Sequence, residues 1–321
     1  LGASHHNIDE IKRIEPSLVG GIKLFMGAST GNMLVDKKEK LDAIFASAKI
    51  PVAVHCEDST IIKKNEEVFR ARYGEAVPMQ HHAAIRSSDA CYQSTAEAVT
   101  LAKRHGARLH VLHLSTQEEL DLFSDTPISD KTITAEACVH HLFFDDRDYE
   151  HKGTLIKCNP AIKSLQDRNA LIEAVKTNRI DTIGTDHAPH TLAEKYNPYF
   201  KAPSGMPLAQ HALVSLLERY HCGDFTLEKI VEKMAHAPAD LFQIDRRGYI
   251  REGYWADLVL VNLQRPWTVT DDTLLSKCAW SPFQGHQFGA TIIATIVSGH
   301  LAWYVDKINE KIKGHRLSFD R

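Results

Sequence analysis

A carboxylate and two imidazoles stand close together in the run Gly184-Thr185-Asp186-His187-Ala188-Pro189-His190. The run follows the apolar stretch 180–183, which we expect to form a short strand that delivers these polar groups onto a loop at its carboxyl end. Active sites of α/β barrels are built at this edge of the sheet. Carboxylates and imidazoles brought together there can hold a metal ion and transfer protons. The alternative is an aspartate that only caps the next helix.

Two further residues of this kind fall in strand-like stretches. Lys23 stands among apolar residues, where a charged lysine is costly to bury, although its ammonium group could also reach the surface along its aliphatic stem. His55 ends the stretch 51–55 and is followed by Glu57 and Asp58, so it could bind zinc with an acidic partner behind it. The alternative for His55 is a partly buried histidine with ordinary hydrogen bonds.

A second pair of histidines occupies the stretch 109–113. His110 and His113 are three positions apart, an odd spacing, so in a regular strand their side chains point to opposite faces. We therefore expect only one of them to face the interior of a barrel. His113 lies nearer the end of the strand.

The elements that must position these residues alternate between short strands and helices, which is typical of a parallel sheet or barrel. We predict strands at 21–25, 51–55, 109–113, 132–137 and 182–186. We predict three helices. One spans 94–105 and ends before Gly106, one begins at a capping box at 115–118, and one spans 226–235. After residue 245 the pattern changes to turns and β-rich runs, with strands expected at 290–297 and 299–305. The sequence therefore predicts a barrel part in residues 1–245, and a small β-sandwich appendage with a C-terminal tail in residues 246–321.

The composition is that of an ordinary globular protein. Of 321 residues, 43% are hydrophobic and 25% charged, and the net charge is -3. Neither nucleic acid nor a membrane is expected as a partner, because the chain has no basic excess and no apolar run long enough to span a bilayer. The six cysteines form no CxxC pair and suit free thiols in a reducing compartment, and no signal pattern opens the chain. We expect a cytoplasmic protein with a small-molecule substrate.

The run 184–190 resembles the aspartate signature of dihydroorotases, within the amidohydrolase superfamily of metal-dependent cyclic-amide hydrolases. The run 251–261 (REGYWADLVLV) resembles the C-terminal sandwich strands that are widespread in amidohydrolases. This resemblance implies an α/β fold: a TIM-like (β/α)8 amidohydrolase barrel, of which this chain carries strands four to eight, with a small β-sandwich appendage.

The resemblance also implies a metal centre. Lys23, His55, His113 and Asp186 match the ligands on strands four, five, six and eight, and His113-Leu114-Ser115-Thr116 matches the family's ligand motif. His110 is then expected to pack against a helix. In relatives, the lysine reacts with carbon dioxide and its carbamate bridges two metal ions, so we expect two zinc ions bridged by carboxylated Lys23.

Substrate-side residues follow from the same resemblance. Asn159 matches an asparagine that bonds the pyrimidine ring, although an Asn-Pro turn is the alternative. His190 matches a histidine that holds the substrate carboxylate, and Pro203 and Gly205 belong to a segment whose backbone contacts the ring amide. The polar and aromatic segment 191–201 is expected to be a mobile lid. His187 is expected to be structural, and no cysteine is assigned as a nucleophile.

The implied activity is the reversible hydrolysis of dihydroorotate to N-carbamoyl-aspartate in pyrimidine biosynthesis. A metal-activated water attacks the ring amide, and Asp186 is a general base and then a general acid. Two alternatives stay open. One is another cyclic amidase, such as a hydantoinase or allantoinase. The other is an inactive dihydroorotase-like scaffold of the kind that partners aspartate carbamoyltransferase.

Part of the family pattern has no counterpart in the chain. Relatives supply a His-x-His pair and an arginine from strand one, whereas here His5-His6 is adjacent rather than alternating. We therefore expect a fragment of a longer protein that binds metal weakly by itself. The sequence leaves open the oligomeric state, a homodimer included, as well as the number of metal ions, the carboxylation of Lys23 and the favoured direction.

Overall fold

Five parallel strands follow one another in chain order across the first sheet of the protein. The structure, a computed structural model, describes residues 1–27, 33–305, 307–311 and 313–321. The strands are β1 (Ile22–Phe25), β2 (Val52–His55), β3 (Leu109–Val111), β4 (Ile133–Cys138) and β5 (Thr182–Gly184). The prediction of a parallel α/β arrangement is confirmed. However, β3 and β5 end at Val111 and Gly184, two residues before His113 and Asp186, at which the predicted strands end.

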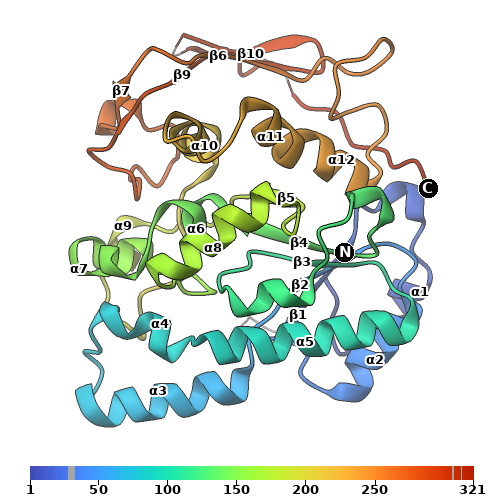
Figure 1. Ribbon diagram of the computed structural model, residues 1–321, viewed down its shortest axis with the longest axis vertical. Helices are drawn as coiled ribbons and strands as arrows, with labels where there is room; N and C mark the ends of the chain where they lie inside the picture. Colours follow the sequence, from blue (N-terminus) through green and yellow to red (C-terminus); the bar gives the residue numbers. More distant parts are fainter. Residues whose placement is uncertain (28–32, 306, 312) are drawn as a thin grey trace.

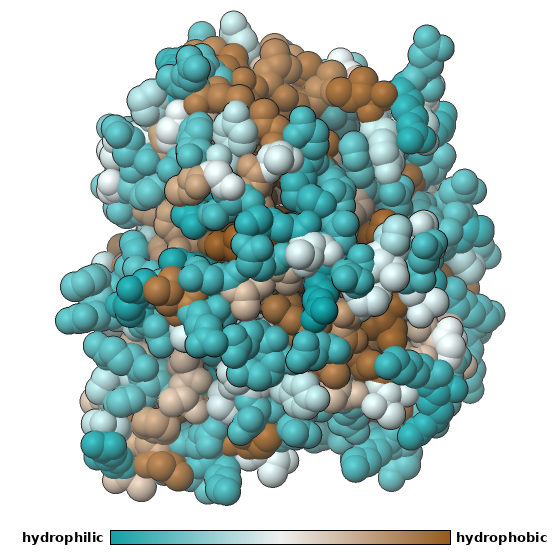
Figure 2. All heavy atoms as spheres, in the orientation of Figure 1, coloured by the Kyte–Doolittle hydropathy of each residue, from teal (hydrophilic) through white to brown (hydrophobic). Residues whose placement is uncertain are grey.

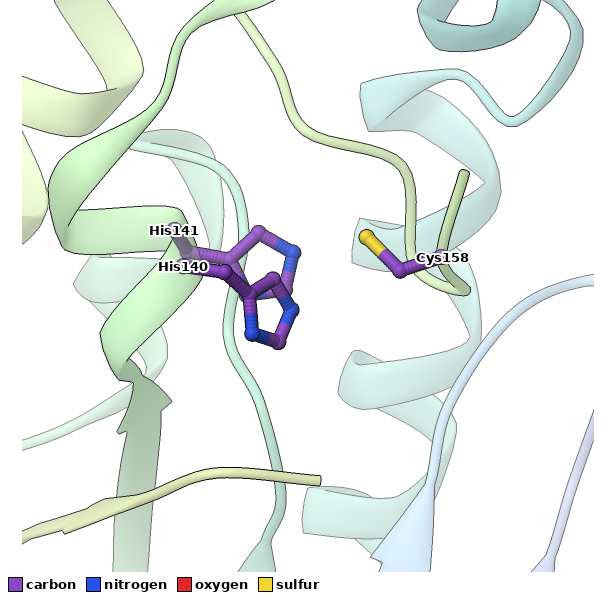
Figure 3. Close-up of side chains that lie close together, drawn as sticks. All are labelled: His140, His141 and Cys158. Atoms are coloured by element: carbon purple, nitrogen blue, oxygen red, sulfur yellow. The ribbon is translucent and has the colours of Figure 1, made fainter. Parts of the chain in front are cut away.

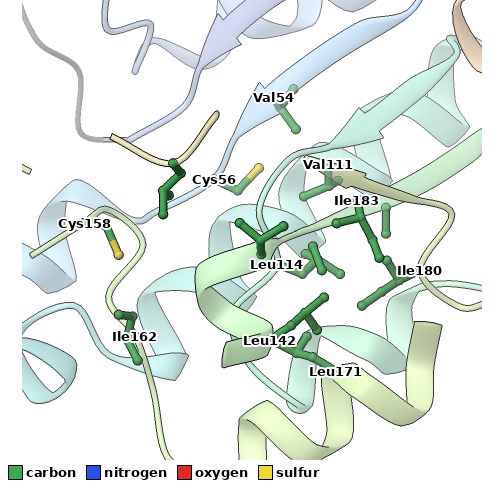
Figure 4. Close-up of a cluster of buried hydrophobic side chains, with 14 of the residues drawn as sticks. Val54, Cys56, Val111, Leu114, Leu142, Cys158, Ile162, Leu171, Ile180 and Ile183 are labelled. Carbon is green, nitrogen blue, oxygen red and sulfur yellow. The ribbon is translucent and has the colours of Figure 1, made fainter. Parts of the chain in front are cut away.

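The register of these strands separates an apolar face from a polar one. Neighbouring residues across a parallel pair point to the same face. One row of partners runs through Leu24, Val54, Val111 and Ala135, and the row beside it is equally apolar. Figure 4 shows Val54, Val111 and Ile183 gathered with Leu142 and Leu171 from the covering helices. Burial of each such side chain contributes about 1.5–3 kcal/mol.

The opposite face of the sheet carries the chemistry. Its rows of partners contain Lys23, Ala53, His110 and Thr134, then Phe25 beside His55. This is the face that would line the interior of a closed barrel. Residues 1–3 extend the sheet at the β1 edge, because Ala3 N–H donates to the Lys23 carbonyl and Lys23 N–H to the Leu1 carbonyl, each at 2.8 Å.

Helices cover the apolar face and connect the two sheets (Figure 1). They are α1 (Ile8–Lys12), α2 (Lys38–Ser47), α3 (Ser59–Tyr73), α4 (His82–Ile85), α5 (Ser88–His105), α6 (Val139–Phe143), α7 (Tyr149–Lys152), α8 (Leu165–Lys176), α9 (Leu192–Lys195), α10 (Ala212–His221), α11 (Leu227–Val231) and α12 (Ala237–Phe242). The predicted helix at 94–105 forms the last two thirds of α5, and Gly106 follows it in the left-handed conformation.

Two helix predictions need correction. The capping box at 115–118 was expected to open an α-helix, but only a short 3-10 helix, Glu118–Leu122, follows. Thr116 pairs there with the buried Glu119, not with Glu118, so the box belongs to a buried polar cluster. The predicted helix at 226–235 begins at its cap Thr226 but continues through a π-helical turn, Glu232–His236, into α12.

A second, antiparallel sheet follows α12. It has the order β11 (Lys307–Ile308), β10 (His300–Tyr304), β9 (Thr291–Val297) and β6 (Leu258–Asn262), and β7 (Trp267–Thr268) pairs with β8 (Gln287–Phe288). Helices α10 to α12 lie between the two sheets (Figure 1). The division of the chain into domains at residue 245 stays a prediction.

Apolar residues are exposed on the second sheet. Val259, Leu260, Leu301 and Ile308 are each between 46% and 57% exposed, and Figure 2 shows the apolar surface gathered over this end of the molecule. Within the described ranges, every helix is too short or too polar to cross a lipid bilayer. All six cysteines are free thiols, and Cys56, Cys91, Cys138 and Cys158 are buried.

Candidate functional site

A chain of four side chains begins at the carboxyl ends of β2 and β3. His55 Nδ1 lies 3.0 Å from His113 Nε2, and His55 Nε2 lies 2.9 Å from Glu57 Oε2. The Arg86 guanidinium donates to the same Glu57 oxygen at 2.6 Å. His55, His113 and Glu57 are 4%, 3% and 0% exposed, so the chain is buried. Glu57 is thus the acidic partner of His55, whereas Asp58 caps α3.

The electrostatics of this chain keep Glu57 ionised. Burial alone would raise the pKa of Glu57, but Arg86 and His55 outweigh that effect and hold the pKa well below its usual range. Burial and the neighbouring His55 lower the pKa of His113, so that its ring is neutral. A neutral imidazole has a free lone pair, as metal binding requires.

His113 and Asp186 both have a backbone that departs from their strands. Their φ angles are 42° and 45°, in the left-handed region that residues with a side chain rarely adopt. Because β3 and β5 have ended, each residue can turn its side chain away from the direction that strand alternation would give. Such strain persists at functional sites when the surrounding structure fixes it.

His110 is the residue for which the alternation argument was wrong. The register places its side chain on the same face as Lys23, where Nδ1 bonds Thr134 Oγ1 at 2.9 Å and Nε2 lies 3.8 Å from Glu136. The expected helix contact is present, since the ring packs edge-on against Phe242 of α12. Both histidines therefore reach the polar face, because His113 lies beyond the regular strand.

Lys23 and Asp186 lie close enough to act on each other. Burial lowers the pKa of Lys23, and the charge of Asp186 opposes this shift. Asp186 as a residue is exposed, yet the protein packed around its carboxyl raises its pKa, while His55 and Lys23 act in the opposite direction. The structure thus brings Lys23, His55, His113 and Asp186 to one edge of the sheet.

Glu136 is a charged residue of this face that the sequence analysis did not single out. It raises the pKa of both Lys23 and Asp186. A Cβ atom on Gly184 would lie only 2.7 Å from its carboxylate, so the glycine makes room for it. The available signal was an acid between two alanines in a buried strand, where an unpaired charge is costly.

The substrate-side residues meet around Ser204. Its hydroxyl donates to Asn159 Oδ1 at 3.0 Å, and its carbonyl lies 3.2 Å from His190 Nε2. The Asn159 Nδ2 group and the His190 Nδ1 atom are not used in these bonds. Gly205 has a φ of 140°, and a Cβ atom there would lie 2.6 Å from the Ala188 side chain. The backbone around Gly205 is therefore packed directly against the loop that carries Asp186.

Two buried lysines hold the segment that includes Pro203 and Gly205. Lys195 Nζ donates to the carbonyls of Lys157, Pro203 and Gly205 at 3.1, 2.9 and 2.9 Å, and its side chain is 0% exposed. Lys157 Nζ donates to the carbonyls of Tyr199 and Ala202 at 2.5 and 2.7 Å. Burial lowers the pKa of Lys195 to about 7 and that of Lys157 to about 8. The segment 191–201, expected to be a mobile lid, is thus held through the buried Lys195 side chain and the Tyr199 carbonyl, and the residues that follow it are held at the carbonyls of Ala202, Pro203 and Gly205.

His187 has a structural contact, in line with its expected role. Its Nδ1 atom accepts from the backbone N–H groups of Leu208 and Ala209, each at 3.0 Å. Burial raises the pKa of the Cys158 thiol to about 12 and that of Cys56 still further, so both thiols keep their protons near neutral pH.

The His55–His113 pair fits a metal ion. Two nitrogens that bind one tetrahedral zinc at about 2.0–2.1 Å lie about 3.3 Å apart, close to the spacing of His55 Nδ1 and His113 Nε2. The second nitrogen of His55 is held by a carboxylate, as is usual for metal-ligating histidines. His113 Nδ1 is buried and has no partner among the described residues.

Comparison with known proteins places the chain among cyclic-amide hydrolases. The amidohydrolase family model matches residues 6–302. The chain is 34% identical over 307 residues to a dihydroorotase of Halobacterium salinarum, covering 94% of this chain and 69% of that protein. It is 32% identical over 295 residues to a dihydroorotase of Pyrococcus furiosus, covering 92% and 64%. The chain therefore spans about two thirds of the length of these relatives.

Solved structures give the same fold. An L-hydantoinase (dihydropyrimidinase) from Arthrobacter aurescens matches with a TM-score of 0.88 and 25% identity, covering 95% of this chain and 69% of that one. The inactive dihydroorotase-like domain of a Chaetomium thermophilum CAD-like multifunctional protein matches with a TM-score of 0.63 and 18% identity, covering 95% and 74%. The expected TIM-like amidohydrolase barrel is confirmed by the first of these likenesses and by the family match.

Proposed function

We propose that this chain carries the catalytic part of a dihydroorotase. The premise is that the chain belongs to the amidohydrolase family and, within that family, to the dihydroorotases. The reaction is the reversible hydrolysis of dihydroorotate to N-carbamoyl-aspartate. The observation that carries the proposal is the sequence likeness to several dihydroorotases over most of the chain, at 30–34% identity. The convergence of Lys23, His55, His113 and Asp186 at one sheet edge supports it. Action in the cytoplasm and in pyrimidine biosynthesis, and pairing into a homodimer, belong to the same proposal.

Zinc is the proposed metal. His55 and His113 would hold one ion through the two nitrogens that face each other. Carboxylated Lys23 and Asp186 would be the further ligands of the proposed two-zinc centre. When bound, the ions would supply a Lewis acid that polarises the scissile carbonyl and acidifies water.

Asp186 is proposed as the group that moves the proton. It lies just beyond the end of β5, and its raised pKa brings it nearer the range in which an acid can both accept and return a proton. The carboxylate takes a proton from the attacking water and delivers it to the departing ring nitrogen. In the cyclisation direction the same proton moves in reverse.

The segment around Ser204 is proposed to bind the substrate. Asn159 Nδ2 would donate to the pyrimidine ring, and the backbone of Pro203 and Gly205 would contact the ring amide. His190 in its charged form would offer Nδ1–H to the substrate carboxylate. Lys157 and Lys195 do not touch the substrate ring in this proposal. Their amino groups hold the backbone carbonyls of this segment in place.

The test is cyclisation of N-carbamoyl-aspartate by this chain, and by the chain extended to the length of its relatives, with zinc and bicarbonate supplied. We expect activity in the extended protein, because the His-x-His pair that relatives carry would complete the metal centre. Activity in the extended protein that is lost with Asp186→Ala supports the proposal. Absence of activity from both chains would contradict it.

A second candidate is another cyclic amidase, which the structural likeness to the L-hydantoinase favours. Hydantoin, dihydrouracil and allantoin assayed beside dihydroorotate separate the two. Preference for dihydroorotate supports the first proposal, and preference for one of the others overturns it. Failure on all of them would favour the inactive scaffold.

A further inference from the structure

Two histidines and a cysteine that no step of the proposed reaction uses lie together at the start of α6. His140 and His141 begin this helix, and Cys158 lies in the segment before Asn159. One nitrogen of each ring and the Cys158 sulfur all lie within 4.8 Å of one another. In the part of the chain that the structure describes, no other group of three histidine, cysteine or acidic side chains comes as close. Figure 3 shows both rings and the sulfur pointing toward a common space.

The hydrogen bonding of His141 sets its tautomer. His141 Nε2 lies 3.1 Å from the Pro160 carbonyl, which can only accept, so the proton is on Nε2. The Nδ1 atom then carries a bare lone pair, and it is buried without a partner among the described residues. A histidine that donates one ring N–H to a carbonyl and leaves the other nitrogen free is oriented as metal-ligating histidines are.

His140 and Cys158 offer the other two donors. His140 Nδ1 is also buried without a partner in the described part of the chain, whereas buried polar atoms normally have one. His140, His141 and Cys158 are 1%, 3% and 2% exposed. The Cys158 sulfur lies 3.2 Å from the Pro160 carbonyl, to which its S–H can donate.

The two histidine rings are neutral and the thiol is protonated, so a metal ion would have to displace only the thiol proton. Burial lowers the pKa of His141 to about 3 and that of His140 well below its usual value, so both rings are neutral. Burial raises the pKa of Cys158 to about 12, so the thiol keeps its proton until a cation replaces it. Binding therefore releases one proton and leaves a thiolate with a single negative charge to offset a divalent ion.

We propose that His140, His141 and Cys158 form an accessory zinc site, separate from the pair His55 and His113. Two imidazoles and one thiolate are donors that zinc prefers, and three protein ligands leave a fourth position for water. The site joins the start of α6 to the residue before Asn159. Occupation would therefore fix the segment that carries this substrate-side residue. It does not depend on the missing His-x-His pair, nor on the proposed reaction.

Cobalt(II) titration of the metal-free chain tests the site, because a thiolate ligand gives a near-ultraviolet charge-transfer band that nitrogen and oxygen ligands do not. We expect the band to saturate with one cobalt equivalent in the wild type and to disappear in Cys158→Ser. It should persist in Cys91→Ser and Cys138→Ser, two other buried cysteines. No band in the wild type, or an unchanged band in Cys158→Ser, would overturn the proposal. Loss of the band in Cys138→Ser with retention in Cys158→Ser would overturn it as well.

Zinc-edge X-ray absorption of the wild type keeps the proposal testable if a variant fails to fold. We expect one sulfur neighbour at about 2.3 Å for the zinc that resists mild chelation. The ligands proposed for the centre around Lys23 include no cysteine, but Cys56 and Cys138 lie near Lys23, so the sulfur neighbour should also persist in Cys56→Ser and Cys138→Ser. A spectrum that contains only nitrogen and oxygen neighbours would contradict the site, whether or not the chain cyclises N-carbamoyl-aspartate.

Discussion

The strand-end cluster around His55 and His113 and the substrate segment 190–205 satisfy their polar groups in different ways. In the cluster, His113 Nδ1 is buried without a partner among the described residues, and His113 and Asp186 have strained backbones. Around the segment, the ammonium groups of Lys157 and Lys195 donate hydrogen bonds to two and three backbone carbonyls, respectively. The first region leaves a polar atom without a hydrogen bond, whereas in the second the buried lysines satisfy the surrounding carbonyls.

This difference predicts where substitutions act. Unpartnered and strained groups add little to stability, so their loss is expected to affect function first. Buried ammonium groups that satisfy several carbonyls contribute to stability, because each carbonyl would otherwise be buried without a donor. Variants in the two regions should therefore separate activity from folding.

Asp186→Ala should have the largest effect on activity. Removal of the proposed proton carrier should lower turnover by about 10²–10⁴-fold from acid–base catalysis alone. The residue is exposed, so the melting temperature should stay close to that of the wild type. Cyclisation rates and thermal melting of the extended protein measure both quantities. Ordinary activity in this variant would remove Asp186 from the mechanism.

Lys195→Met should have the largest effect on stability. Two buried carbonyls and one partly buried carbonyl would lose their donor, and we expect the free energy of unfolding to fall by about 2–4 kcal/mol. The matched control is Lys201→Met, since Lys201 belongs to the same segment but is exposed. Urea unfolding of both variants measures the difference. Equal stability of the two would mean that the segment does not depend on its buried ammonium group.

Glu57→Gln should weaken metal binding without removing a ligand. The amide can still accept from Arg86, but it no longer provides a negative charge behind His55. Loss of such a partner lowers metal affinity by about 10–100-fold. The control is Asp58→Asn, which keeps a helix cap of similar quality beside it. Zinc competition with a chelator measures the affinities, and equal values would place Glu57 outside the metal centre.

The sequence predicted the parallel strands and the residues that gather at their ends, because both follow from local patterns. Apolar runs of four to six residues, each followed by a polar group, predict where a buried strand stops. The structure confirms that Lys23 and His55 lie inside regular strands, where side chains alternate. Their roles as metal ligands stay a prediction.

What the sequence could not predict depends on conformation beyond the strands. The faces of His110 and His113 were assigned by alternation, which fails where a φ of 42° ends the regular backbone. Lys195 was read as part of a polar lid, because nothing in a local pattern shows that an ammonium group can meet three carbonyls brought together by tertiary folding. Glu136 was missed for a similar reason: its neighbours come from other strands.

The pH dependence of stability tests whether the segment 190–205 is stabilised by the buried amino group of Lys195. Burial lowers the pKa of Lys195 to about 7, whereas a lysine in the unfolded chain titrates near 10.4. Between these values the unfolded state binds more protons, so the contribution of Lys195 to stability rises with pH, by up to about 1.4 kcal/mol per pH unit. The wild type should therefore gain stability relative to Lys195→Met between pH 7 and pH 9, although the neutral amine offers only two N–H groups to three carbonyls. Urea unfolding of both proteins across this range measures the slope. A difference that stays constant would mean that Lys195 keeps its proton, held by the carbonyls more strongly than burial disfavours the charge.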